Sequence, residues 1–160
     1  MDRNDLRLLK SSAIFSGMTD QEIVSLEGLF TEKEVSAGKT VFIENMPGES
    51  LFLIREGTIR VSKMLAEGDE QTLVVLGAED SFGEMAVLDE TPRSATARVI
   101  ESARLLSIKR ADFESFCLKN PALGLKLMRN IIRVFNRRIR ECQDEYRDML
   151  LWSLGRKDSR

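Results

Sequence analysis

The chain has 160 residues, of which 42% are hydrophobic and 31% charged, a length and composition typical of one globular domain. Histidine is absent, which excludes His-based catalytic triads and His-ligated zinc or iron sites. The net charge of −2 hides a division: residues 121–160 carry 10 Lys and Arg against 5 Asp and Glu, whereas residues 1–120 carry 14 against 21. The sequence therefore predicts an acidic body followed by a basic tail.

Neither membrane insertion nor export is indicated. No apolar run approaches the roughly 18 residues of a membrane span, and the first 20 residues lack the apolar segment of a signal peptide. The two cysteines, Cys117 and Cys142, have no CxxC spacing and no other ligand residues beside them. We therefore expect a cytoplasmic protein with reduced thiols, with a disulfide between the two cysteines as the alternative.

The first thirty residues predict short helices. Residues 3–10 have an apolar side made by three leucines. Thr19 or Asp20 can cap a second helix, and Glu22, three residues after Thr19, completes the pattern of a capping box. The apolar residues that follow keep helical spacing as far as residue 30. These segments are expected to pack against the body.

Between residues 31 and 109 the pattern changes to short β-rich runs, with glycines at positions 38, 48, 57, 68 and 77. Short strands with turn signals at this regular spacing are typical of a β-sandwich or barrel. Pro47-Gly48 and Gly68-Asp69 are candidate hairpin tips. The candidate strands are KTVFIE, SLFLIREG, TIRVSKML, QTLVVLG, SATARVI and ARLLSIK.

Helical periodicity returns after residue 108. Phe113 and Phe116 lie three residues apart on a short helix that Asn120-Pro121 must end or bend, because the residue before proline disfavours the helical conformation. From Pro121 to about Trp152 the pattern predicts a second helix, about 48 Å long at 1.5 Å per residue. Its apolar positions fit a heptad seam: Leu125, Met128, Ile132, Phe135, Ile139, Cys142, Tyr146 and Met149.

This seam has two interpretations. The helix could simply pack on its own domain, as its first two turns are expected to do. A seam sustained over more than three heptads is better explained by a partner helix, and the simplest partner is a second copy. We therefore expect a homodimer through residues 125–149.

The arginines of this helix also have two interpretations. They could touch nucleic-acid phosphates, or they could form the solvated face of a dimer helix, which we favour.

One segment interrupts the strand pattern, from Ser81 to Ala97. Gly83 permits close backbone approach, and residues 84–88 can form a helical turn whose amides suit a phosphate. Arg93 can bind phosphate oxygens, and Glu84 can accept a hydrogen bond from a sugar hydroxyl. Glycine, helical turn, carboxylate and arginine together fit a ribose phosphate. The alternative makes Glu84 and Arg93 a structural ion pair that closes a loop.

The sequence FGEMAVLDETPRSATARV resembles the phosphate-binding cassette of cyclic nucleotide-binding domains, the family found in catabolite activators and in regulatory subunits of cyclic-AMP-dependent protein kinase. The resemblance covers about residues 8–150. It implies a mainly β fold with flanking helices: an eight-stranded double-sheet jelly roll with a long C-terminal helix. The implied division is a nucleotide-binding part at 1–120, a lid and dimerisation helix at 121–152 and a polar tail at 153–160.

The resemblance also implies roles for individual residues. Glu84 would bind the ribose 2′-hydroxyl, and Arg93 would bind the phosphate with help from Ser94 and Ala95. The phosphate turn would comprise Phe82, Gly83, Met85 and Ala86.

The base would face Leu73, Val75 and Leu76 from a strand, and Arg137-Arg138-Ile139 from the long helix, a stretch without the Ser or Thr that the catabolite activator presents to adenine. Family frequency favours cyclic AMP as the ligand. Cyclic GMP is the alternative, because Ser94 could serve either nucleotide.

Several functions are not expected. The DNA-binding relatives place a helix-turn-helix domain after the long helix, and the eight residues Ser153–Arg160 cannot form a recognition helix. A jelly-roll metalloenzyme would need histidine ligands, and no nucleophile–base pair is evident, so we expect no enzyme, metal or cofactor. Three hypotheses stand: a cyclic nucleotide sensor, a ligand-independent dimerisation module of the same fold, and a truncated transcription regulator.

Overall fold

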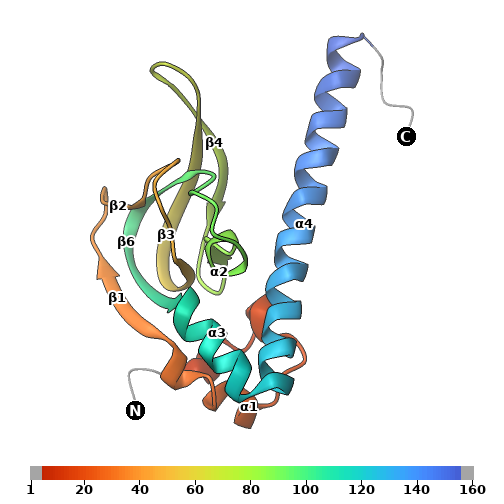
Figure 1. Ribbon diagram of the computed structural model, residues 1–160. Helices are drawn as coiled ribbons and strands as arrows, with labels where there is room; N and C mark the ends of the chain where they lie inside the picture. The colour runs from red at the N-terminus through yellow and green to blue at the C-terminus, as the bar shows by residue number, and fades with distance from the viewer. Residues whose placement is uncertain (1–4, 156–160) are drawn as a thin grey trace.

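The computed structural model describes residues 5–155 as a curved sheet with helices at its base and one long helix rising beside it (Figure 1). Within this range no helix has the length and apolar character needed to cross a bilayer. The elements, with η for a 3-10 helix, are η1 Leu6–Leu9, η2 Ala13–Phe15, α1 Asp20–Val24, η3 Glu27–Leu29, β1 Thr31–Val35, β2 Thr40–Phe42, β3 Ser50–Ala66, β4 Asp69–Leu76, β5 Ser81–Phe82, α2 Met85–Leu88, β6 Thr96–Lys109, α3 Arg110–Lys119 and α4 Pro121–Ser153.

The N-terminal helices are shorter than their apolar spacing predicts. The capping box is confirmed, because the Thr19 hydroxyl accepts from the Glu22 amide at 3.2 Å and the Glu22 carboxylate accepts from the Thr19 amide at 2.8 Å. However, α1 ends at Val24, and the 3-10 helix η3 replaces its expected continuation to residue 30. The helix predicted at 3–10 is the 3-10 helix η1, and residues 3 and 4 lie outside the described residues.

The sheet confirms the mainly β fold class, with six antiparallel strands in the order β1-β6-β3-β4, β2 paired to β6 and β5 to β3. The resemblance implied eight strands, whereas the sheet has six. The six predicted runs form only four of them, because β3 contains SLFLIREG and TIRVSKML and β6 contains SATARVI and ARLLSIK, and the short strands β1 and β5 were not predicted. Gly57, at φ +95°, lies at an irregularity of the β3–β6 pairing. A Cβ there would come within 2.6 Å of the Ala103 Cα. This glycine therefore marks a bulge rather than a turn.

The base of the molecule is one apolar cluster that joins the N-terminal helices, the sheet and the first half of α4. Leu127, Ile131 and Val134 are buried there. The buried Asn130 amide donates to the carbonyl oxygens of Ile14 at 3.0 Å and Ser16 at 2.9 Å. Since buried carbonyls need partners, these bonds tie α4 to the N-terminal segment.

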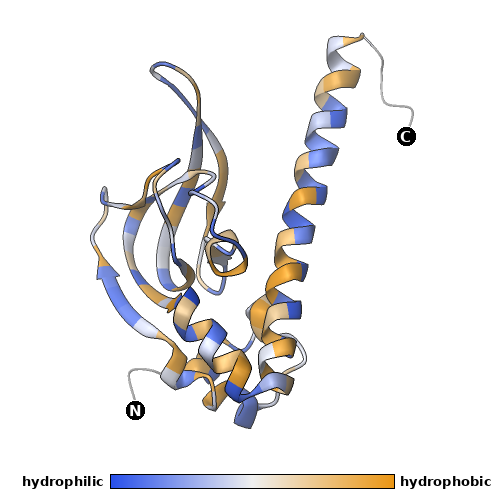
Figure 2. Cartoon of the chain, viewed as in Figure 1, coloured by the Kyte–Doolittle hydropathy of each residue, from blue (hydrophilic) through white to orange (hydrophobic). Residues whose placement is uncertain are grey.

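The second half of α4 leaves this base. As expected, α3 ends at Lys119 and α4 begins at Pro121, after which α4 extends alongside the sheet (Figure 1). Figure 2 shows apolar positions continuing along α4 beyond the packed region. Of the predicted seam, Ile139 is 39% exposed and Tyr146 59%. Cys142 is exposed and free, and Cys117 is also free, so the alternative disulfide is not formed.

Candidate functional site

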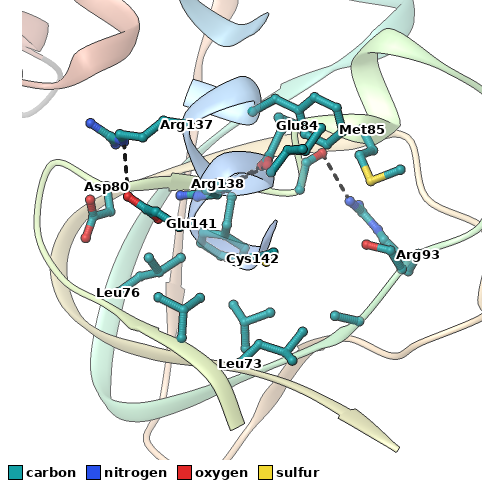
Figure 3. A pocket seen from close by; sticks show the side chains of 18 of the residues that line it. Leu73, Leu76, Asp80, Glu84, Met85, Arg93, Arg137, Arg138, Glu141 and Cys142 are labelled. Atoms are coloured by element: carbon teal, nitrogen blue, oxygen red, sulfur yellow. Dashed lines mark hydrogen bonds and ion pairs between the residues drawn. The ribbon is translucent and has the colours of Figure 1, made fainter. Parts of the chain in front are cut away.

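A cavity of about 800 Å³ lies between the sheet and α4 (Figure 3). Its walls come from β4, from the segment around β5 and α2, from the loop before β6, and from the second half of α4. Every site residue predicted from the sequence lines this cavity: Leu73, Val75, Phe82, Gly83, Glu84, Met85, Ala86, Arg93, Ser94, Ala95, Arg137 and Arg138. The structure therefore brings together two segments that are about forty residues apart in the chain.

Gly83 lines the cavity beside Arg93. Its φ of +74° is a conformation that suits glycine, and a Cβ there would lie 2.8 Å from Arg93 Nη1 and 3.0 Å from the Ser50 carbonyl oxygen. The helical turn expected at 84–88 is present as α2, and its Ala86 amide donates to the Gly83 carbonyl at 3.2 Å. The backbone can thus pass close to the arginine only because residue 83 has no side chain.

Arg93 brings a positive charge into this part of the site. Its side chain is buried, and its Nη1 donates to the carbonyl oxygens of Ser50 at 2.9 Å and Gly83 at 3.4 Å. Its Nε is buried and has no hydrogen-bond partner. Burial lowers the pKa of the Arg93 guanidinium, while the nearby Glu84 carboxylate acts in the opposite direction. An arginine keeps its charge at neutral pH, so the cavity contains a desolvated cation suited to an anion.

Glu84 is buried and pairs with α4. Arg138 Nη1 lies 3.0 Å from both Glu84 carboxylate oxygens (Figure 3). Arg138 Nη2 donates to the Ser81 carbonyl oxygen. The ion pair proposed as an alternative, Glu84 with Arg93, is therefore replaced by Glu84 with Arg138. The count from Pro121 placed Arg138 opposite the base, whereas the structure directs its guanidinium to the carboxylate expected to bind ribose.

The β4 wall of the cavity presents apolar side chains. Leu73 and Val75 lie on the edge strand β4 and are 51% and 54% exposed. Across from them, α4 contributes residues that sequence reasoning missed: Cys142, Gln143 and Tyr146. Helical spacing could have found two of them, because Cys142 and Tyr146 follow Arg138 by four and eight residues on the same face. Arg137 sits at the rim, 4.0 Å from Glu141.

Comparison with known proteins accounts for this arrangement. A family model described as cyclic nucleotide-binding domain matches residues 32–120. The chain belongs to this family. Among the described residues, no group of three or more Cys, Asp or Glu side chains could hold a metal ion.

Individual members of the family are similar over most of the chain. The "CRP-like cAMP-activated global transcriptional regulator" of Mycobacterium tuberculosis is 29% identical over 89% of this chain and 62% of its own length. The crystal structure of Thermus thermophilus catabolite activator protein is 32% identical, with a TM-score of 0.78 over 87% of this chain and 63% of that one. The regulatory domain of Toxoplasma gondii PKA, solved with cAMP, is 28% identical, with a TM-score of 0.63 over 72% of this chain and 45% of that one. The chain thus spans less than two thirds of these relatives.

Proposed function

We propose that the chain is a cyclic nucleotide sensor and that its ligand is cyclic AMP. The observation that carries the proposal is the meeting of Gly83, Glu84 and Arg93 in one cavity, with the arginine buried and the carboxylate beside it. The names of two relatives refer to cAMP, which supports this nucleotide over cyclic GMP. We propose no catalytic activity, in line with relatives that are regulators, and a cytoplasmic location like that expected of a transcriptional regulator.

In this proposal, Arg93 binds the cyclic phosphate. Its Nη1 is held by two backbone carbonyls, which fixes the guanidinium and leaves other N–H donors of the same group for phosphate oxygens. The turn at Gly83, Met85 and Ala86, with Phe82 before it and Ser94 and Ala95 after the arginine, completes the phosphate end. Leu73 and Val75 provide an apolar surface for the base, opposite Arg137 and the α4 residues beyond it.

Arg138 is the proposed link between ligand and helix. The Glu84 carboxylate that would accept the ribose hydroxyl already accepts from Arg138 on α4. A ligand that engages Glu84 therefore changes the balance of contacts that hold the second half of α4. If the protein has two conformations that differ in the position of α4, a nucleotide that binds one of them more tightly shifts the population of molecules toward that conformation.

The output of this movement is proposed to pass through α4. The exposed seam at 125–149 would form a homodimer, and the proposed division assigns 1–120 to nucleotide binding and 121–152 to the lid and dimerisation helix. Residues 156–160 of the predicted polar tail lie outside the described residues. The downstream partner would be a protein, and no sequence-specific DNA binding is proposed for this chain.

Two other hypotheses concern the same fold. A ligand-independent dimerisation module would keep Arg93 buried with an unpartnered Nε and no anion, an arrangement that costs stability without function. The burial of this arginine therefore favours the sensor. A transcription regulator of which this chain is a part would leave the proposed site unchanged, since the chain spans 62% of the Mycobacterium relative.

Titration calorimetry with cyclic AMP tests the proposal. Arg93→Ala should weaken binding by about 100-fold, because two or more charge-assisted hydrogen bonds to phosphate are lost. Arg98→Ala is the matched control, since Arg98 is exposed on the following strand with only a 3.8 Å ion pair to Glu70, and its affinity should equal that of the wild type. Equal affinity of Arg93→Ala and wild type, or no thermal shift of the wild type with either cyclic AMP or cyclic GMP, would contradict the proposal. Tighter binding of cyclic GMP would overturn only the choice of nucleotide.

A further inference from the structure

The contacts that hold Arg93 extend beyond the cassette, to the end of β2 and the segment that leads from β2 into β3. The Arg93 guanidinium carbon lies 4.0 Å from the centroid of the Phe42 ring. The Arg93 backbone pairs with the same segment, because the Asn45 amide donates to the Arg93 carbonyl at 2.8 Å and the Arg93 amide donates to the Met46 carbonyl at 2.9 Å. Side chain and main chain of Arg93 are thus both held by residues some fifty positions earlier in the chain.

Two glycines border the Arg93 side chain, one near its Nε and one near its Nη1. A Cβ at position 48 would lie 2.2 Å from Arg93 Nε, and a Cβ at position 83 would lie 2.8 Å from Arg93 Nη1. The Phe42 ring also lies close to Gly83, with one ring carbon 3.4 Å from the position of a Cβ at residue 83. The guanidinium therefore occupies a slot formed by one aromatic ring and two bare backbone segments.

We propose that Phe42 is a positioning residue for phosphate binding: the face of its ring fixes the Arg93 guanidinium in the orientation that the nucleotide phosphate requires. The proposal rests on the function proposed above and adds a residue to its site.

The physics of the contact supports this role. A guanidinium over the face of an aromatic ring is attracted by the ring quadrupole, and the attraction is strongest where water is excluded. Arg93 is 8% exposed, so little water competes. The attraction also offsets part of the cost of burying this cation. Phe42 thus helps to hold a permanently charged guanidinium in one orientation.

The ring is itself held in place. Phe42 lies 6.0 Å from Phe52 and 5.8 Å from Phe82, and those two rings stack at 5.2 Å between centroids. Arg93 lies against this aromatic cluster, with its guanidinium carbon 5.8 Å from the centroid of the Phe52 ring. A leucine at position 42 would fill much of the same volume but would have no ring face, so packing and positioning can be separated by substitution.

The test compares cyclic AMP with adenosine, which has the same base and sugar but no phosphate. Phe42→Leu should weaken cyclic AMP binding by about tenfold and leave adenosine binding, measured by competition, unchanged. Phe42→Tyr keeps a ring face and should restore wild-type affinity for cyclic AMP. Phe30→Leu is the matched control: it removes a buried ring from the other core cluster, and should leave the ratio of the two affinities unchanged.

Other results would overturn the inference. Equal weakening of cyclic AMP and adenosine by Phe42→Leu would show that Phe42 only packs the fold, as would failure of Phe42→Tyr to restore binding. If the wild type bound neither cyclic AMP nor cyclic GMP, the proposed function would fail, yet the contact could still be judged in the free protein by NMR. The Arg93 Nε–H signal should carry a ring-current shift that Phe42→Leu removes and Phe42→Tyr keeps. An unmoved signal would refute the role of Phe42.

Discussion

The two halves of α4 have the same secondary structure but different surroundings. From Pro121 to Val134 the helix buries Leu127, Ile131 and Val134 in the base of the molecule. Beyond Val134 it carries as many apolar residues, and these are exposed or line the cavity. The helix therefore has two apolar stripes, one buried in its own core and one that is mostly exposed or lines the cavity. Apolar periodicity predicts the helix, but only packing shows which stripe belongs to the fold.

The largest effect on stability is expected in the first half. Leu127→Ala should lower the free energy of unfolding by about 2–5 kcal/mol, because it leaves a void in a fully buried position. Leu125→Ala, two residues earlier and 57% exposed in the single chain, should change it by less than about 0.5 kcal/mol at a protein concentration too low for the proposed dimer to form. Urea denaturation of both variants provides the measurement. Similar losses in the two variants would remove the distinction between the stripes.

An intermediate effect is expected where the second half touches the cavity. Arg138→Gln should cost about 1–3 kcal/mol, because the buried Glu84 carboxylate loses its charged partner. Arg137→Gln is the matched control, since Arg137 is 57% exposed and its ion pair with Glu141 is 4.0 Å long, and it should be nearly neutral. Thermal unfolding without nucleotide compares them. A neutral Arg138→Gln would show that α4 is not coupled to the cassette.

The smallest effect on the fold is expected for substitutions on the exposed stripe of α4. Ile132→Asp combined with Met149→Asp should leave the circular dichroism spectrum unchanged, since both side chains are exposed. The molar mass from light scattering should fall from that of two chains to that of one, because a charge is placed in the proposed seam. Asn136→Asp adds a charge at an exposed position outside the seam and should keep the mass of the wild type. A wild type that is already monomeric would contradict the dimer.

Features that depend on neighbouring residues could be predicted from the sequence. The capping box at Thr19 and Glu22 and the helix boundary at Asn120-Pro121 are local, and both are confirmed. The merging of strands across Gly57 could not be predicted, because that bulge exists only against Ala103 of the paired strand. Likewise β1, with the sequence TEKEV, carries no apolar alternation and is a strand because it pairs with β6.

In the functional site, too, contacts between residues close in sequence could be predicted and contacts between distant segments could not. The cassette residues are close in sequence, so a contiguous motif suffices to place Gly83, Glu84 and Arg93 in one cavity. The contact of Arg138 with Glu84 depends on how α4 is rotated about its axis, and that rotation is set at the base by Asn130 and the buried stripe. Counting residues along the helix from Pro121 does not determine this rotation. The contact of Arg93 with Phe42 joins the loop before β6 to strand β2 and corresponds to no sequence motif.

The free length of α4 makes it a lever arm. From Val134, the last buried residue, to Ser153 the helix extends about 29 Å at 1.5 Å per residue. A tilt of about 10° at this fulcrum therefore displaces the far end by about 5 Å, roughly one helical turn. In the proposed mechanism Arg138 would act on this arm only four residues beyond the fulcrum, so a small rearrangement around Glu84 would be amplified along the rest of its length.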